Sequence, residues 1–178
     1  MPAEVLILDS LAIARAITRI AHEIAERNTR GEGVVLVGIQ RGGVTLASRL
    51  AKLLEPIWNH PVPTGFLDVN MHRDDIHTQV VAPEVHETRI PFDITSKTVI
   101  LVDDVLCSGR TTRAALDAMN DFGRPSCVQL AVLVDRGHRE LPIKADFVGK
   151  NVPTNTTERI QVRWEEVDGQ DRVSLEKA

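Results

Sequence analysis

The chain is poor in the side chains that several kinds of binding protein need. Its 178 residues include four Phe, two Trp and no Tyr. Stacking platforms for single-stranded nucleic acid need aromatic faces, so this composition argues against one. The net charge of −4 gives no overall attraction to RNA, and any RNA binding must use a local basic patch. We expect no DNA partner.

Cysteines and long apolar runs are scarce as well. Cys107 and Cys127 are too few to staple a domain of this size, and we expect both thiols to be reduced. The apolar runs are far shorter than a membrane span, and no charged-then-apolar signal segment opens the sequence. We therefore expect a cytoplasmic protein with no membrane partner, folded as one domain over residues 1–178.

Predicted strands and helices alternate along the chain. Isoleucines recur at helical spacing from Ile13 to Ile24, after a capping Asp9 or Ser10, and the run Val34–Ile39 is typical of a strand buried on both faces. We expect further helices over 44–54 and 111–122, further strands over 65–69, 98–102 and 127–134, and a long loop over 71–91. The alternation predicts an α/β fold with a mostly parallel central sheet flanked by helices.

The segment 99–112, VILVDDVLCSGRTT, carries the clearest functional signal. An apolar run predicts a buried strand, the carboxylates Asp103 and Asp104 follow, and a short glycine-containing loop opens a helix. Ser108, Thr111, Thr112 and the free N–H groups of the helix start can donate to a phosphate. The carboxylates suit vicinal hydroxyls, so the pattern predicts a site for a phosphorylated sugar. The alternative is an ordinary turn whose Ser or Thr caps the helix.

Two common nucleotide-binding patterns are absent. No Lys follows a second glycine as a Walker A loop requires, and the turn 38–43, GIQRGG, does not have the glycine spacing of a dinucleotide fingerprint. This turn nevertheless follows a buried strand and precedes a helix, so its N–H groups and Arg41 are expected at the carboxyl edge of the sheet, where ligands gather. Arg41 as a solvated surface charge is the alternative.

The segment 99–112 resembles the phosphoribosyl-pyrophosphate (PRPP) motif of type I phosphoribosyltransferases. Two further stretches, 133–153 (LVDRGHRELPIKADFVGKNVP) and 16–28 (AITRIAHEIAERN), resemble PyrR, the bacterial pyrimidine-operon regulators with uracil phosphoribosyltransferase activity. The resemblance covers nearly the whole chain. It implies the type I phosphoribosyltransferase fold, with a flexible hood loop over residues 71–91, and a homodimer or larger assembly.

The resemblance implies a role for many residues near the PRPP motif. It assigns PRPP and phosphate contacts to Gln40, Arg41, Gly42, Gly43, Asp103, Asp104, Val105, Leu106, Cys107, Ser108, Gly109, Arg110, Thr111 and Thr112. The implied catalytic residues are Asp103, Asp104 and the hood-loop Arg73. Mg²⁺ is expected to arrive with PRPP, held through its phosphates and by Asp74 as a further ligand, with no transition-metal site.

Two positions depart from the pattern of the relatives. Where relatives often read Thr-Arg-Gly, this chain has Arg41 in place of the Thr and Gly42 in place of the Arg, so the cation is displaced by one residue. Cys107 stands where many relatives carry an aromatic residue, and nothing in the sequence explains it.

The resemblance also implies the acceptor base and a second activity. Uracil contacts fall on Asp135, Arg136, Gly137 and His138, with Ile160 beside the base. A uracil nitrogen would displace pyrophosphate from PRPP to give UMP. UMP or UTP would in turn control binding to pyr leader RNA through Thr18, His22, Arg139, Lys144 and Lys150, and so transcription attenuation. A salvage enzyme without RNA binding, and a purine phosphoribosyltransferase, are the alternatives.

Overall fold

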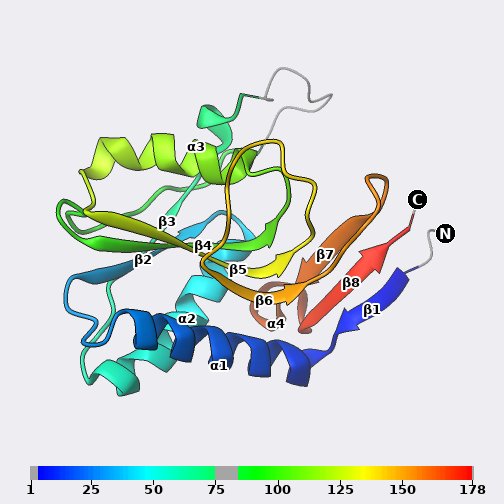
Figure 1. Cartoon of the computed structure of the whole chain (residues 1–178), viewed down its shortest axis with the longest axis horizontal. Coiled ribbons are helices and arrows are strands. Elements are labelled where there is room, and N and C mark those ends of the chain that lie inside the picture. Colours follow the sequence, from blue (N-terminus) through cyan, green and yellow to red (C-terminus); the bar gives the residue numbers. More distant parts are fainter. Residues whose placement is uncertain (1–3, 75–83, 178) are drawn as a thin grey trace.

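A parallel five-stranded sheet forms the centre of the protein. The computed structural model describes residues 4–74 and 84–177. The strands are β2 (Val34–Ile39), β3 (Thr64–Leu67), β4 (Thr98–Leu106), β5 (Cys127–Asp135) and β6 (Phe147–Asn151). Their order is β3-β2-β4-β5-β6, and each neighbouring pair is parallel. The predicted parallel α/β sheet is thus confirmed (Figure 1).

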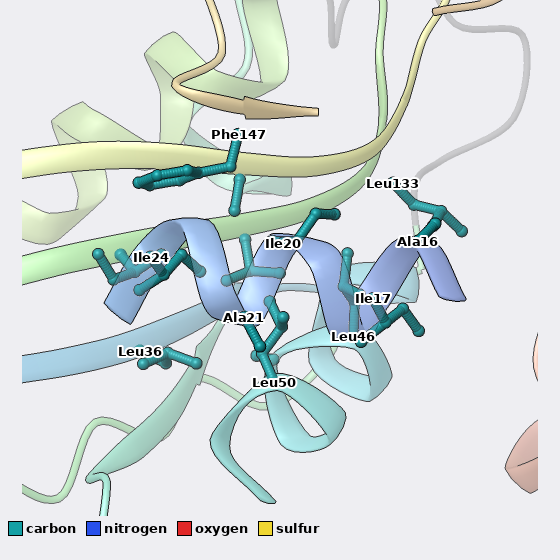
Figure 2. Close-up of a cluster of buried hydrophobic side chains, with 14 of the residues drawn as sticks. Ala16, Ile17, Ile20, Ala21, Ile24, Leu36, Leu46, Leu50, Leu133 and Phe147 are labelled. Atoms are coloured by element: carbon teal, nitrogen blue, oxygen red, sulfur yellow. The ribbon is translucent and has the colours of Figure 1, made fainter. Parts of the chain in front are cut away.

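Helices cover both faces of this sheet. Helices α1 (Ser10–Arg27) and α2 (Gly42–Trp58) lie on one face, and α3 (Arg110–Met119) lies on the other (Figure 1). Successive strand residues therefore enter two different cores: Leu36 packs with α1 and α2, and Val37 packs with α3. Figure 2 shows Ile20 of α1 and Leu50 of α2 within the first core. As predicted, the Asp9 side chain caps α1, accepting from Ala12 N at 2.8 Å.

A second, three-stranded antiparallel sheet was not predicted. It has the order β1-β8-β7, formed by β1 (Glu4–Leu8), β7 (Arg159–Arg163) and β8 (Arg172–Glu176). The short helix α4 (Glu165–Asp168) connects β7 to β8. This sheet joins the two ends of the described chain and lies beside β6 and the end of α1 (Figure 1).

Several predicted boundaries were wrong. Strand β4 continues to Leu106, so the two aspartates lie within it, because its pairing with β5 extends to the Leu106–Asp135 pair. Helix α2 is longer at both ends than 44–54. Helix α3 ends at Met119, and the 3₁₀ turn η3 (Asn120–Phe122) follows. The 3₁₀ turn η1 (Asn70–His72) opens the expected hood loop, of which residues 75–83 lie outside the described residues. Within 4–74 and 84–177, no helix is long and apolar enough to cross a membrane.

Candidate active site

The carboxyl ends of β2, β3 and β4 meet around one cavity of about 450 Å³. The pyrophosphate loop (residues 40–43) contributes Gln40, Arg41 and Gly42, and β4 contributes Asp103, Asp104 and Val105. Arg73 from the hood loop and Thr111 from the start of α3 complete the lining, together with residues between them. Parallel strands bring these segments to one edge, as the sequence predicted.

The two aspartates carry the strongest electrostatic perturbation of the cavity. Burial raises the pKa of Asp103 well above its ordinary value, and the adjacent Asp104 charge raises it further. Burial also raises the pKa of Asp104. Their Oδ1 atoms accept from the N–H groups of Asp104 and Val105 at 2.9 and 2.8 Å, which fixes both side chains. A ligand that brings hydroxyl donors or positive charge would relieve this unfavourable charge burial.

The glycines of the pyrophosphate loop let it lie against β4. A Cβ at Gly42 would stand 1.9 Å from Asp104 Oδ2, and one at Gly43 would stand 2.2 Å from the Val102 carbonyl oxygen. Arg41 of this loop also lines the cavity; its Nη1 is 3.8 Å from Glu84 Oε2 and its side chain is 67% exposed. The displaced cation of this loop therefore lines the same cavity as the aspartates, and its guanidinium is accessible to a ligand.

The phosphate loop (residues 107–112) turns from β4 into α3. Gly109 has φ of 90°, a conformation that side chains rarely adopt, and a Cβ there would lie 3.0 Å from Ile143. Arg110 Nε donates to Glu140 at 2.6 Å. Of the loop residues, only Thr111 lines the cavity, whereas Cys107, Ser108, Gly109, Arg110 and Thr112 do not. The buried Oγ1 of Thr112 has no hydrogen-bond partner in the described part of the chain. Gly43 and Leu106 are likewise buried beneath the site.

Arg73 and Asp74, adjacent in sequence, lie in different environments. Arg73 lines the cavity and its Nη1 donates to Thr111 Oγ1 at 3.1 Å. Asp74 Oδ2 instead accepts from Arg110 Nη1 at 2.5 Å and from Arg113 Nη1 at 2.9 Å. The expectation of Asp74 as a metal ligand is not supported, because this carboxylate ties the hood loop to α3 and does not line the cavity.

A second cavity, of about 460 Å³, lies at the end of β5, and we call it the base cavity because four of the residues predicted to contact uracil line it. It is lined by residues 135–139 and 151–154. Gly137 and His138 both have positive φ, 79° and 61°, which makes the turn tight. Burial acts to raise the pKa of Asp135, but hydrogen bonds from Arg139 and Gly137 N outweigh it and hold the pKa below its ordinary value. Asp135 is thus an ionised acceptor at this cavity.

The lining of the base cavity differs from the prediction in two ways. Residues 151–154 line it although they were not predicted to, and Ile160 was predicted there but does not line it. Asn151 at the end of β6 and residues 152–154 after it line the cavity, and His138 Nε2 lies 2.6 Å from the Thr154 carbonyl oxygen. Their mixed sequence, Asn-Val-Pro-Thr, gave a weak signal, although it falls partly within the stretch that resembles PyrR. Ile160 belongs to β7, packs against the first core and does not line this cavity, because β7 pairs with the separate sheet.

Four of the five expected RNA-binding side chains are exposed. Thr18 and His22 lie on the outer face of α1, Lys150 is exposed on β6, and Lys144 is exposed before it. Arg19 joins these elements, because its guanidinium donates to Glu23 of α1 and to the carbonyl oxygens of Val148 and Gly149. Arg139, the fifth, is only 25% exposed and contacts Asp135.

Comparisons with known proteins agree with this geometry. Residues 6–166 match the phosphoribosyl transferase domain family. A bifunctional protein PyrR from Roseiflexus sp. (strain RS-1) is 64% identical over 163 residues, covering 92% of this chain and 89% of that protein. A Thermus thermophilus bifunctional protein PyrR is 56% identical over 169 residues, 95% and 93% of the two chains. A Trypanosoma cruzi hypoxanthine phosphoribosyltransferase structure shares the fold, with a TM-score of 0.71, 22% identity and 97% coverage of each chain. The chain belongs to the PyrR family and carries its phosphoribosyltransferase domain.

Proposed function

We propose that this chain transfers the phosphoribosyl group of PRPP to uracil, giving UMP and pyrophosphate. The observation that carries the proposal is the aspartate pair, buried Asp103 and half-buried Asp104, between the two glycine-containing loops, with a second cavity at the end of the neighbouring strand. The base cavity is joined to the end of β4, where the phosphate loop begins, since Arg136 N donates to the Leu106 carbonyl oxygen at 3.0 Å. One phosphorylated nucleoside can therefore bind both parts at once.

The reaction needs charge complementarity more than a covalent nucleophile. As the bond from ribose C1 to pyrophosphate breaks, positive charge develops on the ribose, as in glycoside cleavage. Asp103 and Asp104 hold the ribose hydroxyls and, when ionised, stabilise that charge. Arg41 and Arg73 stabilise the departing pyrophosphate. The phosphate loop holds the 5′-phosphate at the start of α3, where free N–H groups meet an anion.

Mg²⁺, when bound, would neutralise negative charge on the leaving pyrophosphate. The residues present fit such an ion only as partial ligands: Asp103 and Asp104 offer the carboxylate oxygens that Mg²⁺ prefers. In the described part of the chain, His, Cys, Asp and Glu side chains form no group of three that could hold a metal ion. We propose that PRPP supplies most of the ligands.

We propose a second function, UMP- or UTP-dependent binding to pyr leader RNA by a homodimer in the cytoplasm. Two features support it: the exposed face of α1 that bears Thr18 and His22, and Lys150 on β6. Arg19 bonds the backbone of β6, so these residues form one contiguous surface (the α1–β6 surface). The product of the transfer would then act as the corepressor.

The two functions have separate tests. Pyrophosphate release is measured with PRPP, Mg²⁺ and a panel of bases. We expect release with uracil and only background with hypoxanthine or guanine, and no release above background with uracil would refute the transferase proposal. Labelled leader RNA is titrated at low and moderate salt. Sequence-blind binding, insensitive to UMP, would refute the regulatory proposal and leave the salvage enzyme.

A further inference from the structure

Arg139 faces into the protein, although it belongs to the charged stretch that resembles an RNA-binding segment. Its Nη2 and Nη1 donate to Asp135 Oδ2 and Oδ1 at 2.5 and 2.9 Å. Nη1 also donates to the Cys107 carbonyl oxygen at 2.9 Å, and Nε donates to that of Ile143 at 2.7 Å. All three guanidinium nitrogens thus bond to this chain. Because its guanidinium already donates to four acceptors within this chain, Arg139 is not free to bind an RNA phosphate.

These bonds join the base cavity to the phosphate loop. Asp135 lines the base cavity, and its backbone oxygen accepts from Val152 N, of the same cavity wall, at 2.8 Å. Cys107 begins the phosphate loop. The next residue, Ser108, accepts on its carbonyl oxygen from Glu140 N and Leu141 N at 3.0 and 3.2 Å. The segment after Arg139 is therefore fastened to the phosphate loop as well.

We propose that Arg139 is a positioning residue that holds the base cavity in register with the phosphate loop and makes RNA binding depend on the bound nucleotide. This inference rests on the proposed function. UMP would place its phosphate in one of the joined parts and its base in the other. Lys144 directly follows Ile143, whose carbonyl oxygen accepts from Arg139 Nε, so a shift of the Arg139 guanidinium moves Lys144 too.

A lysine cannot take over this role. The guanidinium is a planar fork that meets both carboxylate oxygens of Asp135 and still reaches two carbonyl oxygens, whereas an ammonium is a single point of charge. A phosphate contact, by contrast, tolerates lysine because it depends mainly on charge. Arg139→Lys therefore separates the two roles, and Arg139→Gln removes the charge as well.

The experiment compares Arg139→Lys and Arg139→Gln with wild type in uracil kinetics, UMP calorimetry and RNA titration over a range of salt. Lys52→Gln, at an exposed position on α2, is the neutral control, and Lys150→Gln is the comparison for a phosphate contact. We expect both Arg139 variants to raise the KM for uracil and the Kd for UMP roughly tenfold. UMP should no longer strengthen their RNA binding. In a plot of the logarithm of RNA affinity against the logarithm of salt concentration, their slopes should equal that of wild type. Lys150→Gln should instead lower the magnitude of this slope by about 0.7–0.9.

An Arg139→Lys protein with wild-type UMP affinity would overturn the proposal. So would a salt slope that Arg139→Gln lowers as Lys150→Gln does, since that identifies a phosphate contact. Thermal melting of each variant shows whether a weakened affinity reflects unfolding. If Arg139→Gln does not fold, the UMP affinity of Arg139→Lys alone decides whether Arg139 is a positioning residue. Failure of the wild type to make UMP or bind leader RNA would instead refute the proposed function. UMP calorimetry would still test whether Arg139 positions the base cavity against the phosphate loop.

Discussion

Gly42 and Asp104 are so close that residue 42 cannot carry a side chain unless Asp104 moves. A Cβ at position 42 would lie 1.9 Å from Asp104 Oδ2. The positive charge of the pyrophosphate loop stands one residue earlier, at Arg41, which lines the same cavity as Asp104.

The variant Gly42→Ala is expected to fold but to lose activity. Its methyl group meets the end of a side chain, which can rotate away, so the melting temperature should change little. Asp104 would then leave the position in which Val105 N holds it, and kcat/KM for PRPP should fall at least about tenfold, the cost of roughly one displaced charged contact. Melting curves and initial rates measure both effects.

Gly43→Ala is the matched contrast. Its methyl group would meet the Val102 carbonyl oxygen at 2.2 Å, and backbone inside a central strand cannot move aside. We expect a loss of about 2 kcal/mol or more in the free energy of unfolding, measured by urea denaturation. Equal stability losses in the two glycine variants would contradict this account of the loop.

Asp103→Asn should stabilise the protein without ligand while removing most of its activity. The pKa of Asp103 is raised, first by burial and then by Asp104, so at neutral pH the folded state bears the cost of ionising it. Asparagine keeps the acceptor for Asp104 N and has no charge. We expect a gain of about 1 kcal/mol, or ~2–4 °C in Tm.

The same variant has a pH signature. A carboxyl whose pKa is raised by folding binds its proton more tightly in the folded than in the unfolded state, so its contribution to stability falls as pH rises above about 4 and levels off above the folded pKa. The Tm difference between Asp103→Asn and wild type should therefore widen with rising pH. A difference that is constant from pH 4 to pH 8 would show that burial of this charge is not its cause.

Asp74→Asn distinguishes an anchor of the hood loop from a metal ligand. Asp74 accepts from Arg110 and Arg113, so its loss should raise the KM for PRPP without changing the Mg²⁺ concentration that gives half-maximal rate. Arg113→Gln should have a similar, smaller effect, because that arginine is half exposed. A shifted Mg²⁺ requirement in Asp74→Asn alone would restore the metal-ligand assignment.

Arg49 of α2 binds the segment that connects β7 to β8 in the three-stranded antiparallel sheet, and its loss should lower the free energy of unfolding. Its guanidinium pairs with Glu166 and Asp171 at 2.6–2.9 Å and lies 4.8 Å from the centre of the Trp164 ring. Arg49→Gln leaves the nearly buried Asp171 unpaired and should cost about 3 kcal/mol in urea denaturation. Arg124→Gln, at an exposed position, is the control and should change stability by less than about 0.5 kcal/mol.

Much of the central fold could be predicted because its signals are local. The strand Val34–Ile39 matches the predicted range, since all six of its residues are buried and the apolar run ends where burial ends. The glycine turn and the aspartate pair lie at the sheet edge as predicted, because parallel connectivity leaves them no other place. The antiparallel sheet was missed, since it pairs Glu4 with Glu176 at opposite ends of the chain and its strands are short and partly exposed.

The direction in which a side chain points was the second feature that could not be predicted from the sequence. The charge of Arg139 indicated a surface contact, whereas its partner Asp135 stands four residues earlier across a turn with two positive-φ residues, which charge spacing does not reveal. Thr112 was expected at the phosphate, yet on the helix it lines a separate cavity together with Leu116 and Ile143. A residue's type gives its chemistry, but the helix and turn geometry decides which way it points.

The central claim is that one pocket both makes UMP and senses it. The most direct test titrates labelled pyr leader RNA at fixed moderate salt against increasing UMP, with the wild-type protein. We predict a saturable rise in RNA affinity whose half-maximal UMP concentration equals the Kd of UMP for the transferase site. RNA affinity that does not change with UMP, or that responds at a concentration unrelated to that Kd, would contradict the claim.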